Sequence, residues 1–288
     1  MIVSKLMGGL GNQMFQYSLG RRLAQNRGVP LKLDVSWYQD RVAGDADTLR
    51  EYALDGWHIR AAKASAEDLA QFSIGKRLLG RLGLVNIAVL REQELGFEPS
   101  VLDAPHTAYL TGYWQSEKYF KPMRSVLLQE FTLVSAPCAH AAGLEHRVRE
   151  SDSVAVHVRR GDYARNRKSN AYHGLCPAEY YIEAARRIAN RLAKPSFFVF
   201  SDDLDWVRQN LKLDWPTTYV VHDKECSPHQ DIWLMSRCAH HIIANSSFSW
   251  WGAWLSPNEN KVVIAPSQWF THAQYSANDL IPESWLRI

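Results

Sequence analysis

The sequence predicts an α/β protein made of two doubly wound units. Two observations predict it: the chain opens with a strand–helix–strand pattern, and strands and helices alternate again after residue 151. Its 288 residues suffice for two units, and 46% hydrophobic with 22% charged residues is the composition of a folded globular protein. We expect the boundary near residue 140. This gives domains 1–140 and 141–288, with a final helix packing back on the first domain.

The first unit begins with an apolar run over residues 2–7, which predicts a buried strand, and residues 8–11 predict a tight turn. A helix is expected over 12–27, with Gly28 as its stop, and a second strand over 31–35. Such a βαβ opening predicts a parallel sheet. From 37 to 103 the pattern is weaker, with a helical piece over 66–72 and a strand over 85–90.

The second unit shows a sharper pattern. A charged helix over 145–150 connects the halves, and Pro177 suits the first turn of the next helix. Strands are predicted over 154–158, 197–200, 219–221, 241–244 and 262–265, and helices over 177–192, 205–211, 230–237 and 248–255. Two such units facing each other suggest a cleft.

Composition limits the function. The net charge of +3 is too weak for a nucleic-acid-binding protein and fits a local basic site for one phosphorylated ligand. The 11 Trp residues suit either a core or a surface on which sugars stack. No signal peptide or long apolar run is present. We therefore expect a cytoplasmic protein without a transmembrane segment, although peripheral membrane contact stays open.

The four cysteines show no CxxC spacing, which excludes the common zinc and thioredoxin-type patterns. We expect free thiols in a reducing compartment.

The segment His157-Val-Arg-Arg-Gly-Asp-Tyr163 is the first candidate site, because it follows a predicted strand. Ligands of open α/β sheets bind at that strand end, and the arginine fork matches phosphate oxygens. Neighbouring side chains of an extended chain point to opposite sides. One of Arg159 and Arg160 is therefore expected to face the ligand, while the other ties the loop to Asp162 or the backbone. A surface ion-pair loop is the alternative.

A second candidate, Ser201-Asp202-Asp203, also follows a strand. Its carboxylates suit ribose hydroxyls or the N–H edge of guanine, or one of them caps the next helix. The Asp203-Leu-Asp205 spacing resembles a metal motif, but a pair of arginines neutralises a diphosphate without a cation, so no metal is expected.

Asn245, Ser246, Ser247 and Phe248 form a third candidate, ahead of a Trp-rich helix. Helix starts bind phosphate through their backbone N–H groups, and serines add hydroxyl donors. Plain helix capping with a tryptophan core is the alternative, and the two are compatible.

The fourth candidate is the glycine-rich turn with Gly9, Gly11, Asn12 and Gln13. It begins like a dinucleotide fingerprint, but Met14 stands where a third glycine belongs, which argues against an NAD-dependent oxidoreductase. The amides of Asn12 and Gln13 can contact a sugar across the cleft.

These four stretches, in this order between residues 8 and about 255, resemble the bacterial α-1,2-fucosyltransferases of glycosyltransferase family 11. The resemblance implies a GT-B fold, with the acceptor on the N-terminal domain and GDP-fucose on the C-terminal domain. It implies inverting transfer of L-fucose from GDP-β-L-fucose to O2 of a terminal galactose, without cofactor or metal. A different linkage and a non-catalytic carbohydrate-binding protein are the alternatives.

The resemblance also assigns roles. Arg159 corresponds to the arginine that holds the β-phosphate, and His157 to a guanine or ribose contact. Asp231 is similar to an acidic guanine contact of α-1,6 relatives, and residues 246–248 match the phosphate-binding turn. The general base is open between Asp162 and His173, of which histidine has the more suitable unperturbed pKa.

Overall fold

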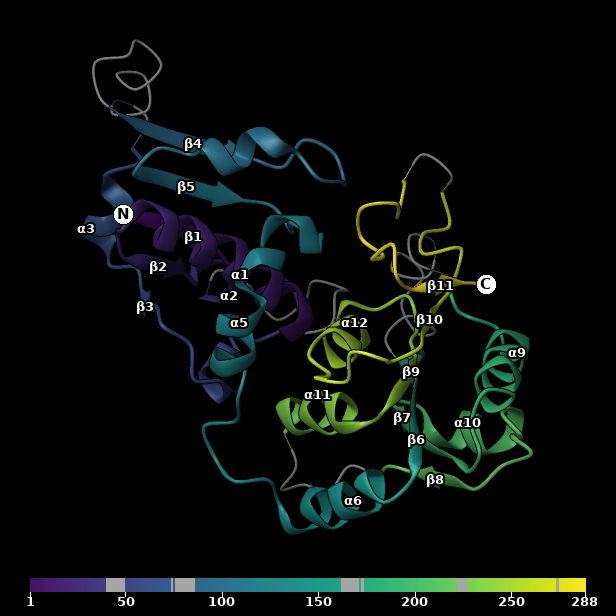
Figure 1. The fold of residues 1–288 in the computed structure, drawn as a ribbon. Helices are drawn as coiled ribbons and strands as arrows, with labels where there is room; N and C mark the ends of the chain where they lie inside the picture. The colour runs from purple at the N-terminus through teal and green to yellow at the C-terminus, as the bar shows by residue number, and fades with distance from the viewer. Residues whose placement is uncertain are drawn as a thin grey trace. The chain divides into compact units, whose positions relative to one another are not determined.

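The computed structural model describes residues 1–39, 50–73, 75, 86–161, 171, 174–221, 227–272 and 275–288. It divides into two compact units (Figure 1), the first formed by 1–132 with 278–280 and the second by 133–277 with 281–288. None of the helices described has the length and apolar character needed to span a lipid bilayer.

Unit 1 contains a parallel sheet with the strand order β3-β2-β1-β5-β4. Its strands are β1 (Ile2–Lys5), β2 (Leu31–Asp34), β3 (Ala62–Lys63), β4 (Ile87–Arg91) and β5 (Thr107–Thr111). Its α-helices are α1 (Leu10–Arg27), α2 (Ser36–Gln39), α3 (Ala66–Ala70) and α5 (Arg124–Glu130). Short 3-10 turns lie at Leu54–Gly56, Pro99–Asp103, Glu117–Tyr119 and Lys121–Met123. The parallel sheet expected from the βαβ opening is confirmed.

Helix α1 is buried on nearly all sides, not on one apolar face. Three polar side chains reach its buried positions because each finds a backbone partner. Gln13 donates to the carbonyls of Gly8 and Glu51, and Ser18 donates to that of Met14. Gln16 accepts from the Met7 N–H and donates to the Gly112 carbonyl. The helix ends, as expected, at Gly28, whose φ of 63° suits glycine.

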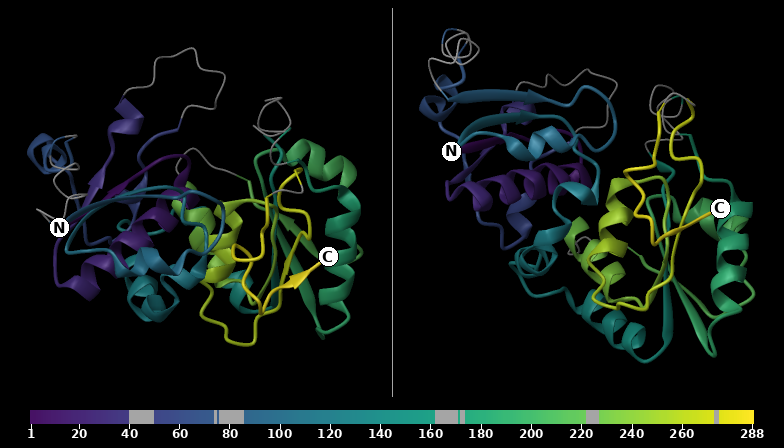
Figure 2. Two further views of the ribbon diagram at one scale, coloured as in Figure 1. Left: turned by 90° about the horizontal axis from the view of Figure 1, so that it is seen from above. Right: turned by 45° about the horizontal axis from the view of Figure 1, so that its top comes forward.

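Unit 2 contains a second parallel sheet, ordered β11-β10-β9-β6-β7-β8. The strands are β6 (Asp152–Val158), β7 (Pro195–Ser201), β8 (Thr217–Tyr219), β9 (His240–Ile242), β10 (Val263–Ala265) and β11 (Leu286–Arg287). The helices are α6 (Ala139–Arg149), α9 (Ala178–Ala189), α10 (Leu204–Asn210), α11 (Pro228–Arg237) and α12 (Ser247–Trp254). Helices α9 and α12 lie on opposite faces of this sheet in both views of Figure 2.

Most tryptophans of unit 2 form core rather than surface. Trp250 and Trp251 are fully buried, and Trp250 stacks on Trp254 at 6.0 Å between ring centroids. The core reading of these residues is therefore confirmed.

Two expectations need correction. The described residues after α12 form turns and strands β10 and β11, so the expected final helix is absent there, and the returning segment Asn278–Leu280 is a turn. Cys138 is disulfide-bonded, which corrects the expectation of four free thiols. Cys176 and Cys238 are free and buried, and burial raises the pKa of Cys176 to about 11.

Candidate functional site

The strand order of unit 2 locates the candidate site. Strand β6 has β7 on one side and β9 on the other, so the chain reverses its direction of winding at β6 and β9. Open α/β sheets bind ligands outside the carboxyl ends of the strands at such a switch point. Arg159 follows β6 directly, and Asn245 lies three residues beyond the end of β9. Two of the candidate stretches therefore meet at this point.

Asp202, at the end of β7, organises the loop that follows β6. Its Oδ1 accepts from the backbone N–H groups of Arg160 and Gly161, both at 2.9 Å. Its Oδ2 lies 2.8 Å from Nη1 of Arg159. Burial alone would raise the pKa of Asp202, but the Arg159 charge and the two N–H donors outweigh it, and the pKa is lowered. Asp202 is thus an anionic anchor that fixes the direction of the Arg159 guanidinium.

Gly161 permits this packing. A Cβ atom at residue 161 would lie 2.7 Å from Oδ2 and 2.9 Å from Cγ of Asp202, well inside van der Waals contact. The glycine is therefore needed for close approach of the carboxylate to the backbone.

Arg160 has different partners from its neighbour. Its guanidinium lies 3.8 Å from the ring centroid of Trp206, and its Nε is 3.7 Å from Oδ2 of Asp203. Asp203 caps α10 by accepting from the Trp206 N–H at 3.2 Å, which is the capping role weighed above. Ser201 in turn accepts from the Asp203 N–H at 3.0 Å. These contacts hold Arg160, Asp203 and Ser201 within the protein.

His157 and Phe248 bring the two strand ends together. His157 is 95% buried near the end of β6, and its ring centroid lies 5.6 Å from that of Phe248 in the first turn of α12. Ser246 caps α12 and accepts from the Phe248 N–H at 3.3 Å. The start of α12 carries partial positive charge, which favours an anion at this end of the helix.

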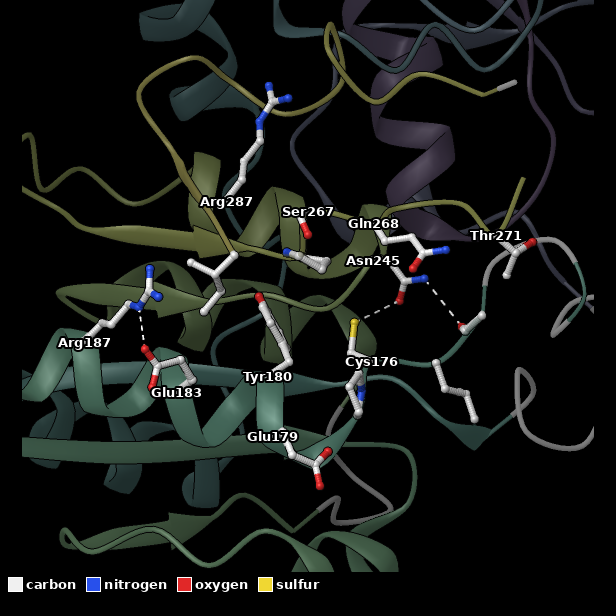
Figure 3. A pocket seen from close by; sticks show the side chains of 15 residues that line it. Cys176, Glu179, Tyr180, Glu183, Arg187, Asn245, Ser267, Gln268, Thr271 and Arg287 are labelled. Carbon is white, nitrogen blue, oxygen red and sulfur yellow. Dashed lines mark hydrogen bonds and ion pairs between the residues drawn. The ribbon is translucent and has the colours of Figure 1, made fainter. Parts of the chain in front are cut away.

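Asn245 is buried and belongs to a pocket of about 770 Å³ (Figure 3). Its Nδ2 donates to the Trp269 carbonyl at 3.2 Å, and its Oδ1 accepts from the Cys176 thiol at 3.5 Å. The lining comes from the start of α9 and from the chain after β10, and includes Cys176, Tyr180, Ser267, Gln268 and Thr271. The pocket therefore lies at the carboxyl ends of β9 and β10, where a ligand-sized cavity of this kind is expected.

The other predicted residues of unit 2 differ in how far the structure describes them. Asp231 is buried in the first turn of α11. Ser247 is half-buried as the first residue of α12. Asp162 and His173, the two candidate bases, lie outside the described residues.

In unit 1 the glycine-rich turn lies at the switch point of the sheet, as the loop after β6 does in unit 2. Strand β1 has β2 on one side and β5 on the other, and the turn follows β1. Gly9 precedes α1 as its N-cap, and Gly11 lies buried in its first turn. Gly8 adopts a φ of 76°, and a Cβ there would meet Nδ2 of Asn12 at 2.6 Å. Asn12 accepts from Gln115 at 2.8 Å, whereas Gln13 is committed to the backbone.

Sequence reasoning missed two contributors. Trp206, which stacks on Arg160, sits one residue after the Asp203-Leu-Asp205 stretch and could have been found as a cation–π partner on the next helix. Arg50 approaches the glycine-rich turn, its Nε 3.8 Å from where a Cβ of Gly9 would be. No local pattern signals that contact, which spans 41 positions of the chain.

The family model and the similar proteins agree on one family. The model of glycosyl transferase family 11 matches residues 93–288. The chain is 34% identical to an alpha-1,2-colitosyltransferase of Escherichia coli, over 100% of this chain and 98% of that protein. It is 31% identical to the O-antigen biosynthesis glycosyltransferase WbnK of Escherichia coli, over 99% of both. Galactoside alpha-(1,2)-fucosyltransferase 2 of Bos taurus is 32% identical over 52% of this chain and 45% of that protein.

Solved structures agree on the fold. The fucosyltransferase NodZ from Bradyrhizobium superposes with a TM-score of 0.50 at 16% identity, over 89% of this chain and 92% of that chain. This likeness, together with the two parallel sheets, confirms the predicted GT-B fold class.

Proposed function

Because the chain belongs to glycosyltransferase family 11 and is therefore a glycosyltransferase, we propose that it transfers L-fucose from GDP-β-L-fucose to O2 of a terminal galactose. The product is an α-1,2 linkage, and the reaction inverts the anomeric centre. The observation that carries this proposal is the anion site at the switch point of unit 2. There, Asp202 holds Arg159, which directly follows β6, and His157 of β6 packs against Phe248 in the first turn of α12.

The charge of the reaction matches that site. As the bond between C1 of fucose and the phosphate oxygen breaks, negative charge grows on the β-phosphate while the sugar gains oxocarbenium character. Arg159 and the start of α12 stabilise the leaving diphosphate. Removal of one such preorganised donor costs on the order of 10²–10³ in rate. His157 and Phe248, packed beside them, suit contacts with the nucleoside.

The acceptor hydroxyl loses its proton to a general base as it attacks. Asp162 and His173 stay the two candidates for this role. Replacing each separately, Asp162→Asn and His173→Gln, and measuring kcat distinguishes them, because only the base variant loses rate while GDP binding is retained.

We further propose that no metal is needed. Asp203 is engaged as the cap of α10, and Asp205 is exposed beside Arg208 at 3.9 Å. Arg159 and the helix start supply the positive charge that a cation would otherwise bring. Activity is therefore expected to survive EDTA, whereas inhibition by EDTA that Mn²⁺ reverses would refute this point.

A second donor is favoured by one specific finding. The full-length relative at 34% identity is named as a colitosyltransferase. Colitose is fucose without its 3-hydroxyl, so GDP-colitose fits any site that accepts GDP-fucose unless the 3-hydroxyl is bound. A site that hydrogen-bonds a substrate hydroxyl rejects the analogue without it by up to roughly 10⁴–10⁵. Comparing kcat/KM for the two donors decides between them.

The test of the proposed function is a transfer reaction with GDP-fucose and lactose, followed by NMR of the product. The expected result is fucose in α linkage to O2 of galactose. Another linkage, or hydrolysis without transfer, would contradict the proposal. A cytoplasmic location stays a prediction. The expectation of free thiols no longer supports it, because Cys138 is disulfide-bonded.

A further inference from the structure

The loop after β5 in unit 1 combines an exposed aromatic ring with a strained, buried neighbour. Tyr113 is 37% exposed, whereas Trp114, the next residue, is 1% exposed. Trp114 has a φ of 56°, the left-handed region that residues with a Cβ rarely adopt. This backbone conformation turns the indole inward and leaves the phenol ring at the surface.

Glu92, one residue beyond β4, holds the loop in this conformation. Its Oε2 accepts from the Tyr113 N–H at 2.7 Å, and its Oε1 accepts from the Trp114 N–H at 2.9 Å. Gly112 allows the approach, since a Cβ there would lie 2.4 Å from that of Glu92. The Glu92 side chain is partly buried, and burial raises its pKa despite the two N–H donors. These contacts fix the backbone from which the exposed Tyr113 ring projects.

The loop is joined to the glycine-rich turn at the switch point of the unit 1 sheet. Gln16 of α1 donates to the Gly112 carbonyl at 3.0 Å, and Gln115 donates to Asn12 at 2.8 Å. The exposed ring and an amide pair therefore lie together at the carboxyl ends of β1 and β5, the place where an open α/β sheet binds its ligand.

We propose that this loop is the acceptor platform: the Tyr113 ring stacks on the apolar face of the terminal galactose, and the Asn12–Gln115 pair contacts its hydroxyls. The proposal rests on the proposed function and names the contacts of its acceptor. Galactose suits such a surface because its axial O4 leaves one face of the ring formed by C–H groups, which pack on an aromatic face. Glu92 acts as a positioning residue, since its oxygens accept hydrogen bonds from backbone N–H groups and do not contact the sugar.

The first test compares Tyr113→Ala with Tyr113→Phe. Loss of the ring is expected to raise the KM for lactose on the order of tenfold, the effect of one aromatic contact, and to leave the KM for GDP-fucose unchanged. Tyr113→Phe keeps the ring and stays within about threefold of the wild type. Val134→Ala, at a residue that is 51% exposed, is the matched control and should change neither constant. An unchanged lactose KM in Tyr113→Ala would overturn the proposal.

Binding is measured separately from transfer, by saturation-transfer NMR with lactose alone. If the wild type binds lactose through Tyr113 but transfers no fucose, the platform stands and the proposed function fails. If the wild type transfers fucose and Tyr113→Ala binds lactose equally well, the function stands and the platform fails. Absence of lactose binding by the wild type also overturns the platform.

The positioning role of Glu92 is tested by a double-mutant cycle. Glu92→Gln replaces one acceptor oxygen with an NH2 group. That group faces a backbone N–H and cannot accept from it, so the loop loses one of its two hydrogen bonds to residue 92. The variant is expected to raise the lactose KM by a similar factor, with kcat and the GDP-fucose KM little changed. In the Tyr113→Ala background, Glu92→Gln should raise the lactose KM almost no further, because both substitutions remove the same contact between the Tyr113 ring and galactose. Fully additive effects would mean that Glu92 does not act through Tyr113.

Discussion

At the scale of single residues, the donor site depends on one carboxylate that never needs to touch the substrate. One oxygen of Asp202 accepts hydrogen bonds from two backbone N–H groups, and the other forms an ion pair with Arg159. The sequence pattern could predict that Arg159 and Asp202 lie at neighbouring strand ends. It could not predict which carboxylate pairs with which arginine, because that depends on side-chain directions across two strands.

Gly161→Ala tests this packing, and Gly143→Ala serves as a comparison whose expected effect on the free energy of unfolding is opposite. Gly161→Ala forces a Cβ against Asp202 and should destabilise the protein by about 1–3 kcal/mol, the usual cost of overpacking, with reduced transfer. Gly143→Ala, inside α6 with open space around the added methyl, should stabilise by about 0.5–1 kcal/mol. Urea unfolding measures both. A neutral Gly161→Ala would show that the loop does not require the close approach.

At the scale of elements, apolar periodicity predicted β6 to β10 and helices α9 to α12 of unit 2 within a few residues. It placed the start of α6 six residues late and missed β11, which has two exposed residues. It missed β5, whose alternation of buried Ala108 and Leu110 was a usable signal, and β3, which has two residues and no buried position. The polar buried residues of α1 also escaped, since their backbone partners lie up to 96 positions away.

Strand β9 carries a histidine whose burial has a consequence for pH. His241 is fully buried, and burial, Lys261 and His240 lower its pKa well below the usual value. The folded protein keeps this ring neutral, while the unfolded chain binds a proton below about pH 6.5, so stability falls as the pH drops through that range. The loss is up to about 1.4 kcal/mol per pH unit.

His241→Gln should therefore flatten the fall in unfolding free energy between pH 7 and pH 5, measured by urea titration at each pH. His140→Gln, at an exposed position of α6, is the control and should leave the slope unchanged. Equal slopes in the wild type and His241→Gln would contradict this account.

At the scale of the whole molecule, the sequence predicted two α/β units and a final helix that packs back on the first. Residues 278–280 do belong to unit 1, but they form a turn and not a helix. Within unit 1, Asp279 accepts from the Phe97 N–H at 2.9 Å and pairs with Lys118 at 2.6 Å. Lys118 and the Phe97 N–H, with burial opposing them, lower the pKa of Asp279. These contacts join residues 161 and 182 positions apart, so no local periodicity could reveal them.

The central claim is that Arg159 holds the diphosphate of the sugar donor, and one measurement tests it most directly. Arg159→Ala is compared with the wild type for kcat/KM with GDP-fucose and for the rise in melting temperature caused by GDP. Arg208→Ala, a half-exposed arginine of the same unit, is the control. We predict a loss on the order of 10²–10³ in kcat/KM and a strongly reduced shift for Arg159→Ala alone. Full activity and an unchanged shift in Arg159→Ala would contradict the claim.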